Sequence, residues 1–178
     1  MIDNGGFIDK YIGDAIMALF PGNADDAVKA GIGMLKTLAD YNLSQEHRDR
    51  QPIEIGIGIN TGTLMLGTVG GSSRIDTTVI GDAVNLSARL EQLTKVYQTP
   101  LLISDNTLAC LKEPTQYALR LIDQGPVRGK TQAVSVFEVF ETDPTDQKQA
   151  KLETKPIFEA AVVNYYTTAI EAAQSLMV

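Results

Sequence analysis

The sequence is poor in the residues that build disulfides, zinc sites and most nucleophile pairs. It has a single cysteine, Cys110, and a single histidine, His47, among 178 residues. One cysteine cannot form a disulfide within the chain, which favours a reducing, cytoplasmic setting. A Ser-His or Cys-His pair would have to use His47, which lies in a charged run. We therefore interpret it as a solvated loop histidine.

Long apolar runs are also missing. No stretch reaches the length of a membrane span, and no basic-then-apolar signal segment follows Met1. Apolar residues make up 44% of the chain and charged residues 21%, which is typical of a globular protein. We therefore expect one cytoplasmic domain with a small appendage and no membrane span.

Positive charge is scarce relative to negative charge. The chain has 15 lysines and arginines against 22 aspartates and glutamates, a net charge of -7. General nucleic-acid binding needs a broad basic face, so this balance argues against it. A small anionic ligand remains compatible if a few cations and a metal act locally.

The clearest local pattern is the stretch Gly6 to Phe20, which reads GFIDKYIGDAIMALF. Two apolar runs flank Gly13-Asp14, which predicts a hairpin with a two-residue turn. Asp14 at the tip either satisfies nearby backbone N–H groups, as turn aspartates commonly do, or meets a ligand. Lys10 alone is interpreted as an exposed strand residue that discourages edge pairing.

Helices and strands alternate along the rest of the chain. The patterns predict a helix from Ala24 to about Tyr41, a strand Ile53–Ile59 with one buried isoleucine face, its partner strand Leu64–Val69, a helix Asp82–Leu93, a strand Leu101–Ser104, a helix Asp105–Leu111, and a closing hairpin of Tyr117–Ile122 and Val134–Phe140. The regular crossovers of a doubly wound fold are missing. We therefore expect an α+β antiparallel sheet with helices on one face.

The last part of the chain changes in composition. Residues 141–155 are polar and contain Pro144, which predicts a linker. Residues 156–178 place apolar residues at helical spacing, which predicts an amphipathic helix. This helix can pack on its own domain, on a partner chain, or begin a helical repeat. The expected organisation is a domain over 1–140, a linker, and this C-terminal helix.

Two further patterns bear on ligand binding. Asn85 and Arg89 are four residues apart on a predicted helix, so they share one face. They either reach one ligand together or are ordinary residues of an exposed polar face. Lys130 follows Gly129, but a Gly-Lys pair without the upstream glycine of a P-loop is weak evidence for phosphate binding.

Two motifs resemble a known family when taken together. The run K-Y-I-G-D-A-I-M-A-L-F, from Lys10 to Phe20, resembles the metal-binding hairpin of class III nucleotidyl cyclases. The run G-D-A-V-N-L-S-A-R, from Gly81 to Arg89, resembles the second signature of the same family. The resemblance covers roughly Gly5 to Phe140 and implies a ferredoxin-like α+β antiparallel sheet.

The resemblance implies roles for six residues. Asp14 matches a metal ligand, Lys10 and Thr78 match the pair that reads adenine, Asn85 matches the residue that orients the ribose, Arg89 matches the one that stabilises charge at the α-phosphate, and Lys130 matches the lysine that holds the terminal phosphates. Guanylate cyclases of the family carry glutamate and cysteine at the base-reading positions, so the resemblance implies ATP as substrate. Threonine instead of aspartate at Thr78 resembles the bicarbonate-responsive subgroup and implies stimulation by bicarbonate.

The implied activity is that of an adenylate cyclase in cyclic-nucleotide signalling. ATP would become 3′,5′-cyclic AMP and pyrophosphate with the help of two Mg²⁺ or Mn²⁺ ions. In the family, the aspartates come from one subunit and the base-reading, ribose and arginine groups from the other. Because this chain carries both sets, the resemblance implies a head-to-tail homodimer.

The match is incomplete at one point. The family's first metal aspartate lies in an F-x-D motif, and Asp3 and Asp9 lack that context. We therefore expect a domain incomplete at its N-terminus that follows an upstream sensory domain. The chain is then either part of an active cyclase or a non-catalytic cyclase-homology module that dimerises and regulates a partner. The presence of the other site residues favours the enzyme, and without a GGDEF-like turn a diguanylate cyclase is a weaker rival.

Overall fold

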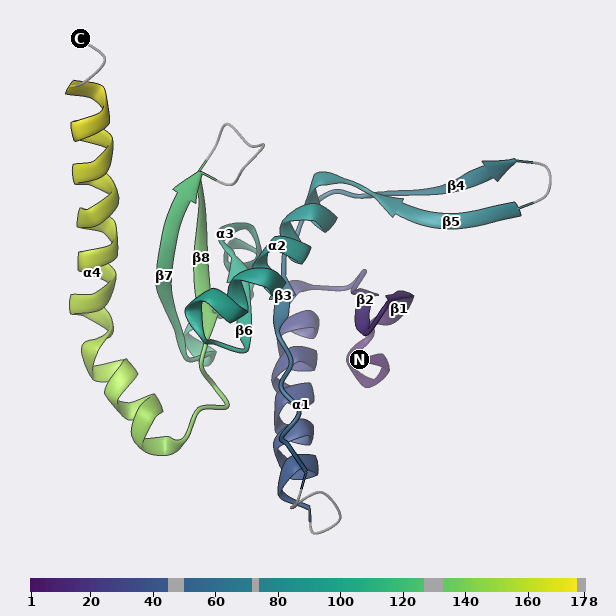
Figure 1. Ribbon diagram of the computed structural model, residues 1–178, viewed down its shortest axis with the longest axis horizontal. Helices are drawn as coiled ribbons and strands as arrows, with labels where there is room; N and C mark the ends of the chain where they lie inside the picture. The colour runs from purple at the N-terminus through teal and green to yellow at the C-terminus, as the bar shows by residue number, and fades with distance from the viewer. Residues whose placement is uncertain (45–49, 72–73, 127–132, 176–178) are drawn as a thin grey trace.

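The computed structural model describes residues 1–44, 50–71, 74–126 and 133–175 (Figure 1). His47 and Lys130 lie outside the described residues. The elements in chain order are the short 3-10 helix η1 (Ile2–Asn4), β1 (Phe7–Ile12), β2 (Ala15–Leu19), α1 (Ala24–Leu43), β3 (Ile57–Ile59), β4 (Met65–Gly71), β5 (Arg74–Ile80), α2 (Asp82–Tyr97), β6 (Leu101–Ser104), α3 (Asp105–Ala109), the 3-10 helix η3 (Pro114–Gln116), β7 (Leu119–Pro126), β8 (Ala133–Val139) and α4 (Thr145–Ser175).

The described strands form three sheets, and the α+β class is confirmed. β1 pairs with β2 and β4 pairs with β5, each as an antiparallel hairpin, while a four-stranded sheet has the order β3-β6-β8-β7. In this sheet the β3–β6 pairing is parallel and the other two pairings are antiparallel. The hairpin β4–β5 projects from the body of the molecule (Figure 1).

One predicted pairing is wrong. The segment from Leu64 to Val69 was expected to pair with the strand ending at Ile59, but β4 pairs with β5 instead. β3 pairs with β6, because the chain after Ile59 is held there by side-chain hydrogen bonds rather than turning back. The Thr107 hydroxyl donates to the carbonyl of Ile59 at 3.2 Å, and the Thr61 hydroxyl donates to Thr107 at 3.2 Å.

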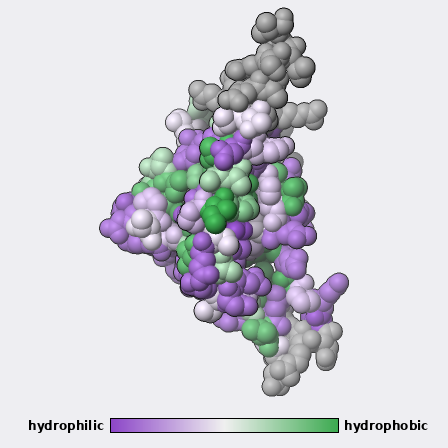
Figure 2. Space-filling view, turned by 90° about the vertical axis from the view of Figure 1, so that its left-hand side faces the viewer, coloured by the Kyte–Doolittle hydropathy of each residue, from purple (hydrophilic) through white to green (hydrophobic). Residues whose placement is uncertain are grey.

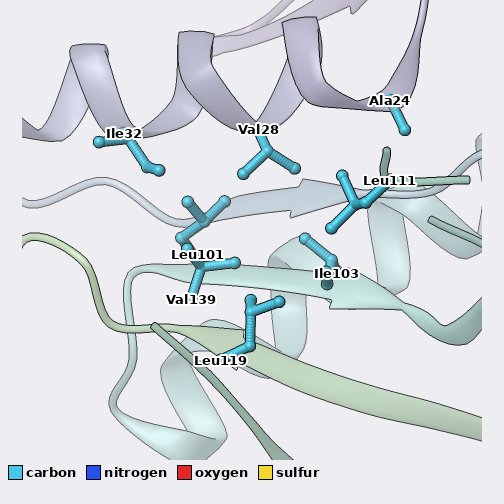
Figure 3. Close-up of a cluster of buried hydrophobic side chains, with 8 residues drawn as sticks. All are labelled: Ala24, Val28, Ile32, Leu101, Ile103, Leu111, Leu119 and Val139. Carbon is cyan, nitrogen blue, oxygen red and sulfur yellow. The ribbon is translucent and has the colours of Figure 1, made fainter. Parts of the chain in front are cut away.

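The core has two layers, one on each face of β6. On one face, Leu101 and Ile103 pack with Val28 and Ile32 of α1 (Figure 3). On the other face, Leu102 packs with Leu86 and Leu90 of α2, and with Val134 and Val136 of β8. Successive strand residues point to opposite faces, so a strand buried at every position needs cover on both sides. The expectation of helices on one face only is therefore wrong.

The start of α1 forms as its sequence predicts. The Asn23 side chain accepts a hydrogen bond from the Asp26 N–H at 3.1 Å, and Asp26 accepts one from the Asn23 N–H at 3.3 Å. These reciprocal bonds form a capping box. The residue before Asp26, Asp25, is buried and accepts hydrogen bonds from the Lys112 N–H at 3.1 Å and the Tyr117 hydroxyl at 2.8 Å. Asp25 thereby ties α1 to the segment that leads into β7.

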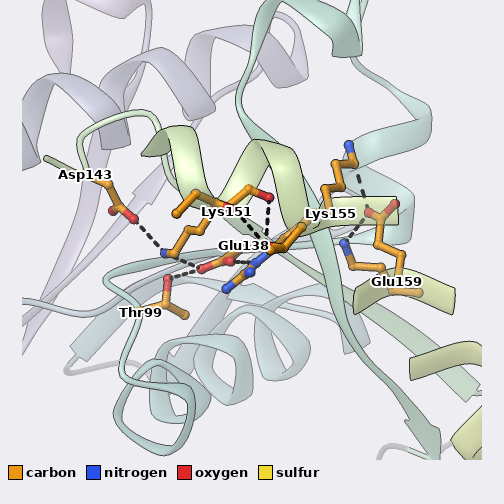
Figure 4. Close-up of polar contacts among 10 residues, drawn as sticks. Thr99, Glu138, Asp143, Lys151, Lys155 and Glu159 are labelled. Carbon is orange, nitrogen blue, oxygen red and sulfur yellow. Dashed lines mark hydrogen bonds and ion pairs between the residues drawn. The ribbon is translucent and has the colours of Figure 1, made fainter. Parts of the chain in front are cut away.

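The C-terminal helix is longer than predicted. α4 begins at Thr145, so most of the expected linker 141–155 is helical. The linker prediction rested on polarity and Pro144 and took no account of contacts with the rest of the chain. Lys151 makes such contacts, because it pairs with Glu138 at 3.1 Å and with Asp143 at 2.6 Å (Figure 4). α4 bends along its length (Figure 1), and Pro156 inside it lacks the N–H that an unbroken helix needs. No described helix is long and apolar enough to cross a membrane.

α4 lies along β7, the last strand of the four-stranded sheet (Figure 1). Three backbone N–H groups in this strand and just before it donate to carboxylates: Leu121 to Glu159 at 2.8 Å, Ala118 to Glu141 at 3.0 Å, and Gln124 to Asp123 at 2.9 Å. The Arg120 guanidinium also lies 4.4 Å from the ring centre of Phe158 on α4. The helix is therefore held by both charged and apolar contacts.

Candidate functional site

Asp14 lies where the sequence predicts it. Ile12 pairs with Ala15, so Gly13 and Asp14 form a two-residue turn, with Gly13 at φ +63°, where glycine is favoured. Asp14 is exposed at the tip. A carboxylate in this place is free of the sheet and accessible to a cation or to solvent.

Lys10 lies on β1 opposite Met17, just after an irregularity in the pairing of the two strands. Its ammonium group forms an ion pair with the Asp9 carboxylate at 3.4 Å, and its side chain is about one-third exposed. Lys10 and Asp14 therefore belong to one hairpin, with Lys10 held by a neighbouring carboxylate and Asp14 at the tip.

Asn85 and Arg89 both lie in the first half of α2. They are one turn apart, as their spacing predicts, with Asn85 exposed and Arg89 half-buried. Leu86 and Leu90 of the same helix are buried against the sheet. The helix thus packs through one stripe and leaves Asn85 accessible to a ligand, with Arg89 at the border of the packed surface.

α2 packs unusually close to β3 because β3 has glycines on the facing side. A Cβ atom at Gly58 would collide with the backbone of Ser87 and Glu91, and one at Gly56 would collide with the Thr94 hydroxyl. The Ser87 hydroxyl donates to the Gly58 carbonyl at 2.8 Å. The sequence analysis did not recognise why isoleucine and glycine alternate here. The isoleucine side of the strand packs in the core, and the glycine side leaves room for α2 to pack against the strand backbone.

Asn60 is a second residue that the sequence analysis did not assign to the site. Its side-chain amide donates to the Ala83 carbonyl, in the first turn of α2, at 3.0 Å. Its side-chain oxygen accepts a hydrogen bond from the Ser104 hydroxyl at 2.7 Å. Asn60 therefore fixes the start of α2 relative to the ends of β3 and β6. A polar residue directly after a buried strand was the available signal.

The remaining predicted site residues are less well defined. Thr78 lies on β5 opposite Gly67, within the projecting hairpin. Lys130 lies outside the described residues, so its predicted phosphate contact stays a prediction. The structure therefore brings the predicted residues into two groups, Lys10 with Asp14 on one hairpin and Asn85 with Arg89 on α2, with Thr78 on a third element.

The described residues do not by themselves fit a two-metal site. They contain no group of three or more histidine, cysteine, aspartate or glutamate side chains close enough to share a metal ion. Hard cations such as Mg²⁺ take carboxylate and other oxygen ligands, and Asp14 offers one carboxylate at the tip of its turn. The arrangement fits a shared site to which Asp14 contributes a single ligand.

A separate open hollow of about 450 Å³ lies between α4 and the sheet. Its lining consists of Leu121, Phe137, Glu159, Ala160, Val163 and Asn164. Of the described residues predicted for the site, none lines this hollow. We therefore assign the candidate site to the hairpin β1–β2 and to α2, and not to the α4 side of the molecule.

The described residues thus form an α+β domain with a carboxylate at a hairpin tip and an Asn–Arg pair on a helix. Residues 9–139 match the family described as the adenylate and guanylate cyclase catalytic domain. The chain belongs to this family, the class III nucleotidyl cyclases. The resemblance stated from the two sequence motifs is thereby confirmed.

Individual relatives of this chain are named as adenylate cyclases. An adenylate cyclase of Anabaena cylindrica is 50% identical over 76% of this chain, and the terminal-differentiation-specific adenylate cyclase of Dictyostelium discoideum is 39% identical over 97% of it. The crystal structure of the adenylyl cyclase CyaB from P. aeruginosa is 31% identical, with a TM-score of 0.64 over 78% of this chain and 73% of that chain. The matched region spans only 28% of the Anabaena protein and 8% of the Dictyostelium protein.

Proposed function

We propose that the chain is an adenylate cyclase catalytic domain that converts ATP to 3′,5′-cyclic AMP and pyrophosphate. The observation that carries the proposal is the placement of Asn85 and Arg89 on a helix seated directly on the backbone of β3. A rigid helix that presents an amide and a guanidinium one turn apart is suited to a ribose and a phosphate. The relatives named adenylate cyclase support the same reaction.

The proposed reaction is an internal displacement at phosphorus. The ribose 3′-oxygen forms a bond to the α-phosphorus, the bond from that phosphorus to the bridging oxygen breaks, and pyrophosphate leaves with the electron pair. The 3′-hydroxyl gives up its proton to solvent water. Arg89 meets the charge that develops on the α-phosphoryl oxygens, and Asn85 holds the ribose in line.

Class III cyclases generally use divalent metal ions. Bound to this site, Mg²⁺ or Mn²⁺ would lower the pKa of the ribose hydroxyl and neutralise the triphosphate. Asp14 is the residue of this chain that we assign as a ligand, since its carboxylate is exposed at the hairpin tip. A domain with a second aspartate close to Asp14 would complete a two-carboxylate site.

We propose a head-to-tail homodimer as the working assembly. Lys10 and Asp14 lie on the β1–β2 hairpin, whereas Asn85 and Arg89 lie on α2. Among the described strands, β1 and β2 form a two-stranded sheet of their own. A two-fold arrangement that brings one subunit's Asp14 to the other subunit's Lys10, Asn85 and Arg89 would create two equivalent sites. Each site would then use residues from both chains.

Lys10 and Thr78 are the residues that we propose for reading the adenine base. Replacing Lys10 by glutamate, in Lys10→Glu, should shift preference from ATP toward GTP, because a carboxylate accepts hydrogen bonds where the ammonium group donates them. The ratio of kcat/KM for the two nucleotides measures the shift. An unchanged ratio would remove Lys10 from base recognition.

Stimulation by bicarbonate is a further part of the proposal and rests on Thr78. Cyclic AMP formation should rise when bicarbonate is added at constant pH and ionic strength, with chloride as the matched control salt. Thr78→Asp should reduce this response. An activity that bicarbonate leaves unchanged would remove this assignment without affecting the cyclase reaction.

The direct test is an assay of the purified chain with Mn²⁺ and either ATP or GTP, with cyclic nucleotide as the readout. A complementation assay makes it sharper. The chain is mixed with an Anabaena cyclase domain that carries alanine at the position aligned with Arg89, so that only this chain can supply an arginine there.

Cyclic AMP production that depends on this chain, and is lost with its Arg89→Ala variant, would support the proposal. Binding to the Anabaena domain without any gain in activity would instead favour a non-catalytic, regulatory module. Activity that Arg89→Ala leaves intact would show that the arginine does not act in the reaction, and would overturn the role given to α2.

A further inference from the structure

Asp123 receives hydrogen bonds from two helices that are far apart in the sequence. The hydroxyl of Tyr97, the last residue of α2, donates to one carboxylate oxygen, and the hydroxyl of Tyr166 on α4 donates to the other. Asp123 lies on β7 at a register shift in the pairing with β8. Such a bulge redirects a side chain out of the regular strand pattern. One carboxylate thus joins α2, β7 and α4.

Both phenols keep their protons at neutral pH and remain donors. Burial, followed by the hydrogen bond to Asp123, raises the pKa of Tyr97 above its usual value. The hydrogen bond to Asp123, followed by burial, raises the pKa of Tyr166 to about 12. Hydrogen bonds from neutral donors to an ionised carboxylate are stronger than those between neutral groups. The three-residue link is therefore intact in the pH range in which a cell works.

The link ends close to the proposed reaction centre. Tyr97 follows Arg89 on the same helix by about two turns. The other end of α2 is fixed by Asn60 and Ser87, through bonds to Ala83 and Gly58. α2 is therefore anchored at its start to β3 and at its end to Asp123, and Arg89 lies between the two anchors.

α4 lies outside the stretch 9–139 that matches the cyclase family. α4 leaves Ile157 and Tyr165 exposed, while Val163 lines the hollow toward the sheet. Figure 2 faces the side of the molecule on which α4 lies, and it shows hydrophobic patches scattered among hydrophilic ones. α4 is partly exposed and is bonded to Asp123 through Tyr166, and Asp123 is bonded to α2 through Tyr97. A shift of α4 would therefore displace the end of α2.

We propose that Asp123 is a positioning residue that couples α4 to α2, so that the seating of α4 sets how Asn85 and Arg89 are presented. The inference rests on the proposed function for its effect on turnover. The coupling of the two helices is a physical claim that holds with or without catalysis, and it is tested separately below.

Tyr166→Phe removes the hydroxyl that reaches Asp123, and Tyr165→Phe is the matched control. The Tyr165 side chain is 69% exposed, and its ring meets that of Tyr166 edge-on at a centroid distance of 5.2 Å. The control therefore removes a neighbouring phenol hydroxyl while keeping both rings. Asp123→Asn is a second test, because its NH₂ group cannot accept a hydrogen bond from the second tyrosine.

Amide hydrogen exchange is the readout that does not depend on activity. In Tyr166→Phe and Asp123→Asn we expect faster exchange over the last turns of α2, although the substitution at Tyr166 lies on another helix. Tyr165→Phe should exchange like the wild type. A lower melting temperature with unchanged exchange in α2 would show that Asp123 only fastens α4, and would overturn the coupling.

Steady-state kinetics on the complemented enzyme give the second readout. Tyr166→Phe should lower kcat by about fivefold and leave KM for ATP within about twofold, since the substrate contacts themselves are unchanged. Tyr97→Phe and the double variant with Tyr166→Phe should match it, because each breaks the same link. Additive losses would contradict a single coupled path.

The two claims fail in different ways. If the wild-type chain makes no cyclic nucleotide alone or in complementation, but exchange in α2 responds to Tyr166→Phe, the proposed function fails and the coupling stands. If the wild type is active and kcat is unchanged in Tyr166→Phe, the positioning role fails and the function stands.

Discussion

Arg89 has a burial suited to acting on a transition state. It is half-buried on a helix whose neighbours Leu86 and Leu90 pack into the core, so the backbone that carries its guanidinium is held in place. Preorganised donors stabilise developing charge more than ground-state charge, because they need no rearrangement during the reaction. The sequence predicted the Asn85–Arg89 spacing from helix geometry, but it could not show how firmly the helix is seated.

In an assembly that turns over ATP, Arg89→Ala should lower kcat by about a hundredfold and weaken ATP binding only slightly. Arg89→Lys should recover little, because the ammonium group lacks the two-pronged geometry of the guanidinium. Lys95→Ala removes an exposed positive charge from the same helix and serves as the control. Comparable losses in binding and in kcat for Arg89→Ala would contradict a transition-state role.

Asp25 provides a pH-dependent contribution to stability. Burial alone would raise the pKa of this carboxyl, but the hydrogen bonds from Lys112 and Tyr117 and the charge of Lys29 together lower it below the usual 3.8. A carboxyl whose pKa is lower in the folded than in the unfolded state stabilises the fold above the unfolded pKa. This stabilisation is lost as the pH falls through the folded value.

The melting temperature of the wild type should therefore fall more steeply below about pH 4 than that of Asp25→Asn, which cannot ionise. Tyr117→Phe removes one donor to Asp25 and should move the loss toward higher pH. Thermal unfolding followed by circular dichroism between about pH 2 and pH 5 measures both effects. Parallel curves for the wild type and Asp25→Asn would contradict the role given to this carboxylate.

Several elements could be predicted from sequence, since their signals are local. The hairpin around Asp14, the start of α1 at its Asn23 cap and the strand Leu101–Ser104 all depend on residues within a few positions. Strand partners and helix length could not be predicted in the same way. The pairing of β3 with β6 depends on contacts such as that of Thr107 with the Ile59 carbonyl, 48 residues apart, and the early part of α4 depends on Glu138.

The close seat of α2 on β3 should be sensitive to a single methyl group. Gly58→Ala places a Cβ against the backbone of Ser87 and Glu91, so α2 must shift, at a cost of about 1–3 kcal/mol. Gly33→Ala is the matched control, because an added Cβ there meets nothing within 4 Å. In a helix interior that control should raise stability by up to about 1 kcal/mol.

Urea unfolding of the two glycine variants measures these differences, and the assay for cyclic AMP measures their effect on function. We expect Gly58→Ala to lose activity beyond its loss of stability, because the displaced helix carries Asn85 and Arg89. Equal stability in Gly58→Ala and Gly33→Ala would show that α2 tolerates the shift and is not rigidly held.

At the scale of the whole molecule, the separation of Asp14 from α2 onto different elements leads to a test of the proposed dimer. Asp14→Ala and Arg89→Ala should each be inactive, while a mixture of the two should regain activity. A mixed dimer would have one site with both substitutions and one with neither, so random mixing should restore about a quarter of the wild-type rate. A mixture that stays inactive, although sedimentation shows mixed dimers, would contradict sites shared between subunits.

The carboxylates along β7 have a consequence for solubility. An outer strand with free N–H groups is a template on which other chains can add and aggregate. Here Glu141, Asp123 and Glu159 accept from three N–H groups of this border, and α4 lies across it. Removing α4 would therefore uncover an aggregation-prone border. With α4 in place, β3 is the outer strand of the described four-stranded sheet that is left for a further strand to join.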